Sequence, residues 1–286
     1  MRPQRIALVT GANQGIGFAL VQGLAERLDA TDLVLLTGRN PERVAAAVKR
    51  VNGKAETQGR VLDVTDATAV ANLAADLQTQ YGGVDLVISN AIGPLTPDRT
   101  QAEQADEFIA VANGGTTAVL RSFAPVLRKA GRLIVVASSL GTLDNLDAKV
   151  QPAFEDGHTL DQLEQTVEDW RQSIHAGTAS EQGWPDWINT PSKVAQVAAV
   201  RAVAATRRTE DLANGTLIAS VCPGLVDTRA SRPWFDDFSQ ARTPEEAVQP
   251  ILDLILTDHV DPTTYGELIR DGKVLPWLGE SEPATT

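Results

Sequence analysis

Residues 10–17 read Thr10-Gly11-Ala12-Asn13-Gln14-Gly15-Ile16-Gly17, after an apolar run (residues 6–9) and before a helix-like segment (residues 18–28). A strand, a glycine-rich turn and a helix in this order form the pyrophosphate site of dinucleotide-binding proteins. The first glycine permits a sharp turn, the second lets backbone amides approach phosphate, and the third lets the helix pack on the strand. The stretch therefore predicts a dinucleotide site, and the alternative is a tight strand-to-helix turn without a ligand.

Composition narrows the class of protein. The chain has 286 residues, 43% of them hydrophobic, a formal charge of −12 and a pI near 4.7. An acidic chain is a poor partner for nucleic acid or an anionic membrane surface, so we expect neither. The single cysteine, Cys222, excludes an internal disulfide and suits a reducing compartment. With no signal peptide or membrane-length apolar run, we expect a cytoplasmic protein with a small-molecule substrate.

Apolar runs alternate with helical periods along the chain, which predicts an α/β fold: a doubly wound parallel sheet of about seven strands with helices on both faces. We expect residues 1–286 to form one Rossmann-type domain. The expected strands lie near residues 5–10, 33–37, 60–64, 84–90, 131–138, 216–222 and 266–270. The expected helices lie near residues 15–28, 41–51, 66–80, 101–129, 160–176 and 190–208.

The spacing Gly-x-x-x-Gly-x-Gly after a threonine resembles the short-chain dehydrogenase/reductase family. The resemblance implies that Gly11, Asn13, Gln14, Gly15, Ile16 and Gly17 contact the cofactor. Arg39 follows the second expected strand, where NAD-dependent enzymes usually carry an acid. A guanidinium suits a 2′-phosphate, so the sequence favours NADP(H), although a solvated arginine is the alternative. Asp63 and Val64 match the adenine-binding position, where Asp63 alternatively braces a turn.

Two asparagines match further family elements. Ser89-Asn90-Ala91-Ile92-Gly93 resembles the family's Asn-Asn-Ala-Gly, with serine in the first place and an extra Ile92. The resemblance implies that Asn90 braces the sheet near the cofactor. Asn113 matches the helix position where the family's asparagine holds a water molecule near the catalytic lysine. The alternative for Asn113 is a polar residue at the surface.

The catalytic half departs from the family at one position. Residues 131–141 match the strand that carries the catalytic serine, which indicates Ser138, with Ser139 as the second choice and a substrate contact. A strand-ending serine pair without a catalytic role is the alternative. The family then has Tyr-x-x-x-Lys on a helix, and this chain has Lys193 with Asn189 in place of the tyrosine. An amide donates a hydrogen bond but cannot deliver a proton near neutral pH. Asn189 or Thr190 alternatively caps the helix before Pro191.

Three explanations for the missing tyrosine remain open. Another acid substitutes for it, the candidates being Asp186, His158, His175 and Glu181. Or the acceptor needs no proton, as with an iminium or a conjugated double bond. Or the chain does not reduce anything and is an NADP(H)-binding sensor or a redox-neutral cyclase or isomerase. Replacement of an original tyrosine by engineering is a further alternative. The three histidines have no metal-ligand spacing, so no metal is expected.

Two segments are expected to surround the substrate. The insertion at residues 142–186 ends in Gly183-Trp184-Pro185 and resembles the carbonyl reductase subgroup, which implies a monomer. Trp184 and Trp187 are candidate substrate contacts. A lid is expected at residues 228–243 and carries Trp234; a surface helix is its alternative. The family's Pro-Gly element implies cofactor contacts at Pro223, Gly224, Val226 and Thr228.

Taken together, these residues predict an NADPH-dependent oxidoreductase that transfers hydride to a small carbonyl, imine, iminium or conjugated acceptor. Ser138, Asn189, Lys193 and Asn113 form its candidate catalytic set. Lys193 is also expected to bind the nicotinamide ribose of the cofactor.

Overall fold

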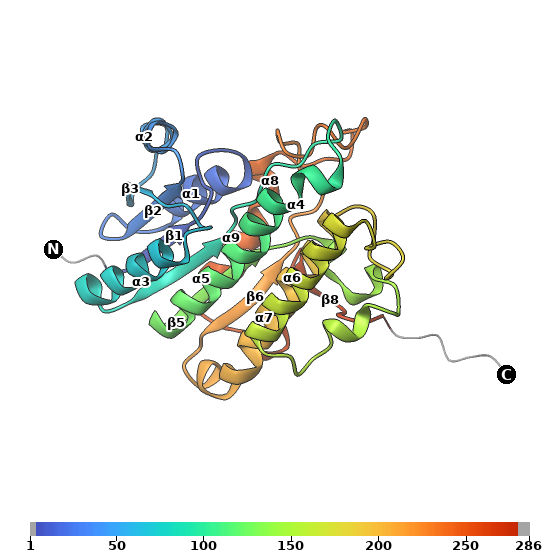
Figure 1. Cartoon of the computed structure of the whole chain (residues 1–286). Helices are drawn as coiled ribbons and strands as arrows, with labels where there is room; N and C mark the ends of the chain where they lie inside the picture. The colour runs from blue at the N-terminus through green and yellow to red at the C-terminus, as the bar shows by residue number, and fades with distance from the viewer. Residues whose placement is uncertain (1–3, 280–286) are drawn as a thin grey trace.

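The computed structural model describes residues 4–279. Its centre is an eight-stranded sheet in the order β3-β2-β1-β4-β5-β6-β7-β8 (Figure 1). Neighbouring strands are parallel except for the antiparallel pair β7 and β8. The strands are β1 (Ile6–Val9), β2 (Leu33–Gly38), β3 (Glu56–Val61), β4 (Val84–Ser89), β5 (Leu127–Val136), β6 (Leu217–Val221), β7 (Leu268–Arg270) and β8 (Lys273–Leu275). The predicted doubly wound parallel sheet is confirmed.

The sheet has one strand more than the seven expected. β8 returns on β7 through the two-residue turn Asp271-Gly272, whose φ angles are 50° and 75°. Positive φ at both central residues is what a two-residue hairpin requires, and Asp-Gly is a favoured pair there. The hydrophobicity pattern does not predict β8 because this strand is only three residues long and mostly exposed.

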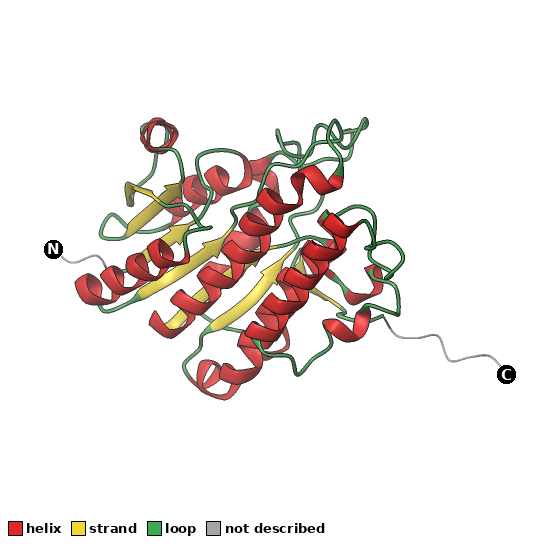
Figure 2. Ribbon diagram, viewed as in Figure 1, coloured by secondary structure: helices red, strands yellow, loops and turns green. Residues whose placement is uncertain are grey.

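Helices cover both faces of the sheet (Figure 2). On one face α3, α5 and α7 lie side by side, and on the other α1 packs against α8 and α9. The helices are α1 (Gly15–Arg27), α2 (Pro41–Val48), α3 (Ala67–Tyr81), α4 (Gln101–Ile109), α5 (Gly115–Phe123), α6 (Leu160–Ala176), α7 (Asn189–Ala213), α8 (Pro244–Ala247) and α9 (Gln249–Leu256). Within residues 4–279, no helix has the length and apolar character of a bilayer-spanning segment.

The strand order reverses direction at β1, which lies between β2 and β4. In open α/β sheets the crevice for a ligand forms at such a point, outside the carboxyl ends of the strands. The glycine-rich turn follows β1 at this edge, and Asn90 follows β4. The fold therefore places these two predicted elements together.

The prediction of a single helix over residues 101–129 is wrong in detail, because this stretch is not one continuous α-helix. It is divided into α4, a π-helical turn η1 (Ala110–Gly114), α5 and a 3-10 turn η2 (Ala124–Val126), and β5 already begins at Leu127. Glycines 114 and 115 weaken the α-helical pattern because glycine has low helix propensity. The Thr116 hydroxyl also donates to the Ala112 carbonyl (2.6 Å). We call the continuous stretch 101–123 the α4–η1–α5 rod.

The insertion at residues 142–186 contains two 3-10 turns, η4 (Leu143–Asn145) and η5 (Gln151–Ala153), and helix α6. A capping box of Thr159 and Gln162 starts α6, and Gly177 ends it in the left-handed conformation. α6 packs against α4 and α7. A second hydrophobic cluster fills the space beneath it, including Phe108, Phe154, Trp170, Trp184 and Ile188.

The lid expected at residues 228–243 consists of turns without a helix. Trp234 of this segment reaches across to the Leu95 carbonyl, to which its indole nitrogen donates (3.2 Å). Its ring also lies 5.4 Å from the ring of Trp187, centroid to centroid. The lid is therefore tied to the loop after β4 and to the segment before α7.

Candidate functional site

The glycine-rich turn fits a dinucleotide pyrophosphate. Gly11 has φ 62°, and a Cβ there would lie 2.7 Å from the Cα of Ala91. A Cβ at Gly17 would lie 2.7 Å from the Gly11 carbonyl oxygen. Gly15 has φ 56°, and its nearest neighbour is the Thr228 methyl, 3.7 Å from a built Cβ. Each of these three positions thus requires glycine for space, for conformation or for both.

The first turn of α1 suits an anion. Gln14 precedes the helix with an extended backbone, its side chain makes no capping bond, and the first turn carries no acidic residue. Free N–H groups and the positive end of the helix dipole face this point. A phosphate group therefore matches the donors that this turn presents.

Asn90 braces the turn, as expected. Its side-chain amide donates to the carbonyl oxygens of Thr10 (2.9 Å) and Gly11 (3.3 Å). The Thr10 hydroxyl in turn accepts from the backbone amides of Asn90 (2.9 Å) and Ala91 (3.1 Å). These bonds fix the carboxyl ends of β1 and β4 against each other.

The predicted adenosine side of the site carries Arg39, Asp63 and Val64. Arg39 is largely exposed, and its only ion-pair partner among the described residues is Glu107 at 3.4 Å. Asp63 Oδ1 accepts from the backbone amide (3.0 Å) and hydroxyl (2.8 Å) of Thr65, so the turn-bracing role is present. Val64 is buried against Gly115. Arg39 thus remains accessible for a phosphate group.

Ser138 follows the end of β5, and the turn after it packs on α7. Its hydroxyl oxygen accepts from the Leu140 amide at 3.3 Å, which leaves the O–H free to donate. The neighbouring Ser139 amide donates to the Cys222 sulfur (3.1 Å), so the buried thiol supports this turn. The placement suits Ser138 as a hydrogen-bond donor at the edge of the sheet.

Lys193 is fully enclosed on α7. Its ammonium donates to the side-chain carbonyl of Gln196 (2.8 Å) and to the backbone carbonyl of Val136 (3.4 Å). Burial lowers the pKa of Lys193 to about 8, and the nearby Cys222 thiol offsets a small part of this effect. The lysine therefore sits beside the strand end that carries Ser138, with its charge only partly compensated.

Gln196 is a site residue that the sequence reasoning missed. Its carboxamide accepts from Lys193 and donates to the Ala112 carbonyl (2.8 Å) and the Thr116 hydroxyl (3.0 Å), all of them buried. The available signal was a glutamine three residues after the lysine, on the same helix face and inside an apolar run. Gln196 links the lysine directly to the α4–η1–α5 rod.

Asn113 lies in the π-helical turn and is buried, so the alternative of a surface residue is wrong. Its amide nitrogen donates to the Ser192 carbonyl (2.9 Å), while its Oδ1 has no partner. π-helical turns inside α-helices frequently occur at functional sites. The structure places Asn113 next to the residue before the lysine, and Gln196 contacts the lysine itself.

Asn189 is the first residue of α7, and the helix cap is Ile188, without a side-chain capping bond. The interpretation of Asn189 or Thr190 as the cap is therefore wrong. Within residues 4–279, the buried Oδ1 of Asn189 has no hydrogen-bond partner, and neither does the buried indole nitrogen of Trp187. Two buried polar groups without partners among the described residues thus lie shortly before Lys193. The ring of Trp187 in this segment also contacts the ring of Trp234.

The candidate substitute acids bond to other groups. The rings of His158 and His175 contact the Pro152 carbonyl (3.0 Å) and Asp106 (2.7 Å), respectively. Asp186 accepts from the Ser180 hydroxyl (2.8 Å), and Glu181 is exposed. Trp184, a predicted substrate contact, packs inside the insertion with its ring 5.7 Å from Trp170 and 6.0 Å from Phe154. These contacts account for Trp184 as a packing residue within the insertion.

The Pro223-Gly224 element follows β6, with Gly224 at φ 80°. Beyond it, the buried Val226 forms a β-bridge with Arg242, which joins the chain before the expected lid to residues near its end. The Thr228 hydroxyl bonds to that of Ser231 (3.1 Å). Thr228 also adjoins Gly15, so this element and the glycine-rich turn meet at one edge of the sheet.

Comparison with known proteins agrees with this arrangement. The family model described as short chain dehydrogenase matches residues 5–150. Carbonyl reductase (NADPH) 3 of Rattus norvegicus is 30% identical over 96% of this chain and 98% of its own length. Carbonyl reductase (NADPH) 1 of Mus musculus is 28% identical over 95% of this chain and 98% of its own.

Solved structures share the fold. Salutaridine reductase from Papaver somniferum superposes with a TM-score of 0.79 and 22% identity, covering 93% of this chain and 99% of its own. An NADPH-bound carbonyl reductase from chicken fatty liver gives a TM-score of 0.67 and 22% identity, covering 97% of this chain and 100% of its own.

Proposed function

The chain belongs to the short-chain dehydrogenase family, and from this we propose that it is an NADPH-dependent oxidoreductase with an atypical active site. The proposed acceptor is a small organic molecule with a carbonyl, an imine or iminium, or a conjugated double bond. The relatives named above as carbonyl reductases support the reaction class. The observation that carries the proposed atypical site is Asn189, whose buried Oδ1 has no hydrogen-bond partner within residues 4–279 and which stands where the resemblance implies a tyrosine.

The residues present fit NADP(H). The pyrophosphate matches the glycine-rich turn and the uncapped first turn of α1, and Arg39 is accessible for a 2′-phosphate. When bound, the cofactor supplies the hydride. Lys193 would hold the nicotinamide ribose, and the segment Pro223–Thr228 would meet the nicotinamide end. The relatives named carbonyl reductase (NADPH) support the same cofactor.

The protein's own groups orient the acceptor. The Ser138 hydroxyl is free to donate a hydrogen bond to a carbonyl oxygen. Asn189 adds an amide, which binds without supplying a proton. Hydride addition to an iminium carbon gives a neutral amine with no further proton, so the reaction is complete without an acid. A ketone would instead leave an alkoxide that needs a proton. Hydride addition to a conjugated carbonyl compound leaves an enolate, which is less basic than an alkoxide and can take its proton from water. We therefore propose that cationic imines and polarised conjugated acceptors are favoured over simple ketones.

NADPH consumption tests this function. The protein is incubated with NADPH and with ketones, aldehydes, cyclic imines and enones across a range of pH, while NADPH fluorescence reports binding. Turnover of imines or enones above that of ketones is expected. Ketone turnover that falls above an acidic pKa would instead indicate a substitute acid. Failure to bind NADPH contradicts the proposal altogether.

A non-reducing function is the second candidate, and the observation that favours it is the asparagine at position 189, whose amide cannot supply a proton near neutral pH. Such a protein would hold NADP(H) as a sensing or structural ligand, or would use the old pocket for a cyclisation or isomerisation. Tight NADPH binding without consumption in the presence of any acceptor class would select this candidate.

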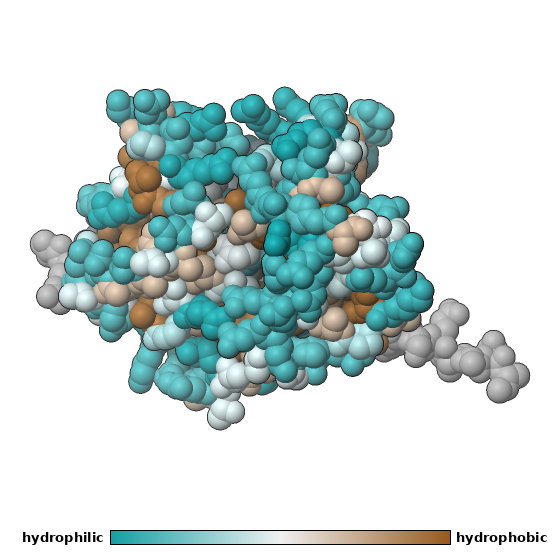
Figure 3. All heavy atoms as spheres, in the orientation of Figure 1, coloured by the Kyte–Doolittle hydropathy of each residue, from teal (hydrophilic) through white to brown (hydrophobic). Residues whose placement is uncertain are grey.

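We also propose that the protein is a monomer. Helix α6 packs over α4 and α7. The outer face in this region is mainly hydrophilic, with small separate apolar areas (Figure 3). A stable interface between copies of the chain normally needs a larger and more continuous apolar surface.

A further inference from the structure

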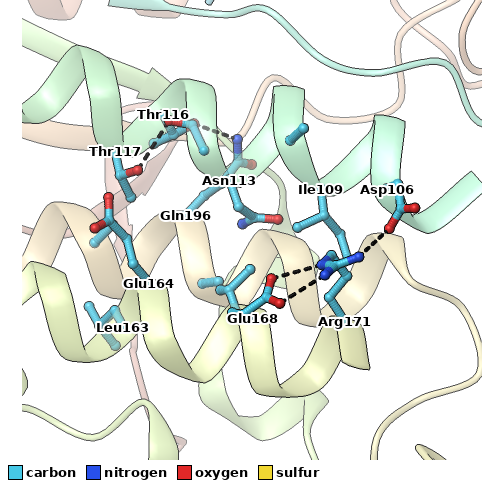
Figure 4. Close-up of a pocket in the computed structure, with 15 residues that line it drawn as sticks. Asp106, Ile109, Asn113, Thr116, Thr117, Leu163, Glu164, Glu168, Arg171 and Gln196 are labelled. Atoms are coloured by element: carbon cyan, nitrogen blue, oxygen red, sulfur yellow. Dashed lines mark hydrogen bonds and ion pairs between the residues drawn. The ribbon is translucent and has the colours of Figure 1, made fainter. Parts of the chain in front are cut away.

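A cavity of about 420 Å³ lies between α6, α7 and the α4–η1–α5 rod (Figure 4). Its wall is mostly apolar and includes Ile109, Leu163, Val167, Ala195 and Ala199. Small-molecule sites commonly have volumes of about 300–1,000 Å³. Of the proposed catalytic residues, only Asn113 belongs to its lining. The cavity therefore adjoins the proposed catalytic set through Asn113, while Ser138, Asn189 and Lys193 are not among its lining residues.

One wall residue is a hydrogen-bond acceptor without a donor. Asn113 is 4% exposed, and its amide nitrogen is already bonded to the Ser192 carbonyl. Its Oδ1 accepts no hydrogen bond from any of the described residues. A buried carbonyl oxygen left unpaired costs free energy, which a ligand with an N–H or O–H group would recover. The other amide on the wall, Gln196, has its oxygen and nitrogen occupied by protein partners.

The charges around the cavity select against anions. Three carboxylates belong to the lining, on Asp106, Glu164 and Glu168, against the single guanidinium of Arg171. Arg171 bonds to Glu168 beside it on α6 and to Asp106 across on α4, as Figure 4 shows. Glu164 pairs with Arg121. A carboxylate ligand would add to this excess of negative charge, whereas an amine would reduce it.

We propose that this cavity is a binding site for a small apolar amine. The apolar body would occupy the space between α6 and α7, and an amine N–H would donate to Asn113 Oδ1. The apolar wall favours a ligand with an apolar body. The unpaired acceptor favours such a ligand with a donor over a plain hydrocarbon, and the three carboxylates of the lining favour an amine over an acid.

The site is connected to Lys193. Gln196 lines the cavity, and its carboxamide oxygen accepts from the Lys193 ammonium (2.8 Å). An occupant that shifts Gln196 alters the group that holds this lysine. Binding of the amine therefore changes the affinity for NADPH, a consequence that rests on the proposed function of Lys193.

Three matched probes test the site: 1-naphthylmethylamine, 1-naphthylmethanol and 1-naphthoate. They share a ring and differ in charge and in hydrogen-bond donors. Calorimetric titration of the full chain without NADPH should rank the amine first and the carboxylate last, with an affinity difference of about tenfold or more. Equal affinities, or tighter binding of the carboxylate, would overturn the proposal.

Variants locate the site. Val167→Phe adds a ring from α6 into the cavity and should weaken amine binding about tenfold or more. Gln165→Phe adds the same ring at an exposed position of α6 and should leave the affinity unchanged. If Val167→Phe does not fold, Ala110→Trp replaces it, because Ala110 lines the cavity but is exposed. Wild-type affinity in whichever of the two variants folds contradicts the assignment.

A titration of NADPH with and without saturating 1-naphthylmethylamine tests the connection to Lys193. The connection is supported if the amine changes the NADPH affinity of the wild type but not that of Val167→Phe, or of Ala110→Trp where Val167→Phe does not fold. An NADPH affinity that the amine leaves unchanged in the wild type overturns the connection. Because amine binding is measured without NADPH, failure of the amine site leaves the proposed reductase function untouched. Failure to bind NADPH leaves the amine site untouched in the same way.

Discussion

At the scale of single residues, the proposed chemistry depends on Asn189. Replacing Asn189 by tyrosine would supply, four residues before Lys193, the acid that the family resemblance implies. Asn189→Tyr should raise kcat/KM for a simple ketone by roughly 10²- to 10⁴-fold, the usual contribution of general acid catalysis. Asn189→Phe supplies the ring without the hydroxyl and serves as the control. If both variants gain equally, the gain comes from packing, and the proposed reason for poor ketone reduction is wrong.

Arg39 sets the expected cofactor preference. Arg39→Met removes the charge-assisted hydrogen bonds to a 2′-phosphate, which are typically worth about 1.5–3 kcal/mol. The ratio of NADH to NADPH dissociation constants should therefore fall by roughly 10- to 100-fold, as measured by fluorescence titration. Arg43→Met, an exposed residue on α2, is the matched control. An equal change in both variants would reflect general charge.

Lys193 makes stability depend on pH. Its pKa is about 8 in the folded protein against an ordinary value of 10.5, so the unfolded chain binds more protons between these values. The folded state therefore gains stability from Lys193 as the pH rises from 8 to 10.5 and loses it as the pH falls through 8. The gain relative to Lys193→Met should reach about 3 kcal/mol in urea unfolding.

The exposed Lys273 supplies the control for this experiment. Other groups titrate over the same range of pH, and the comparison between wild type and a variant removes their contribution. A pH-independent difference for Lys193→Met, matching that for Lys273→Met, would show that Lys193 is hydrated in solution.

At the scale of elements, α6 depends on Trp170. This side chain is fully buried and packs against Trp184. Trp170→Ala should lower the free energy of unfolding by about 3–5 kcal/mol, because it removes apolar contacts and leaves a cavity. Phe235→Ala, at a 44% exposed aromatic residue of the lid, should change it by less than about 0.5 kcal/mol. Similar melting temperatures for both variants would mean that the second cluster adds little stability.

Elements with strong local signals could be predicted from the sequence. The range 160–176 for α6 agrees with the structure because a capping box precedes it and Gly177 follows it. β1 and β2 are uninterrupted apolar runs and are buried throughout. β3 begins earlier than expected, at Glu56, because an edge strand is held by backbone pairing and needs few apolar side chains.

The residues of the candidate site show the same difference between local sequence signals and long-range contacts. The glycine-rich turn, Ser138 and Lys193 could be proposed from the sequence because each follows a fixed spacing. The bonds from Gln196 to Ala112 and Thr116 and the support that the Cys222 thiol gives to the Ser139 amide could not, since they join elements distant in sequence. Whether Asn189 caps α7 was also undecidable from residue types, because a helix can begin at the asparagine itself, as it does here.

At the scale of the whole molecule, the inserted helix predicts the oligomeric state. Sedimentation equilibrium at micromolar concentrations should give a single species of 30.5 kDa. The reason is that α6 packs on α4 and α7 and so removes these helix faces from contact with another copy of the chain. A species of twice this mass that persists on dilution would contradict the proposed monomer.

The π-helical turn η1 has a consequence for how the chain tolerates changes in length. A π-helical turn holds one residue more than an α-helical turn, so it absorbs an insertion without rotating the helix after it. If residues 110–114 were α-helical, α4 would be rotated by about 100° relative to α5. Phe108 would then leave the cluster beneath α6, or Phe123 would leave the sheet core. Deleting one residue within this turn should therefore preserve both cores, whereas the same deletion within α4 or α5 should disrupt one of them.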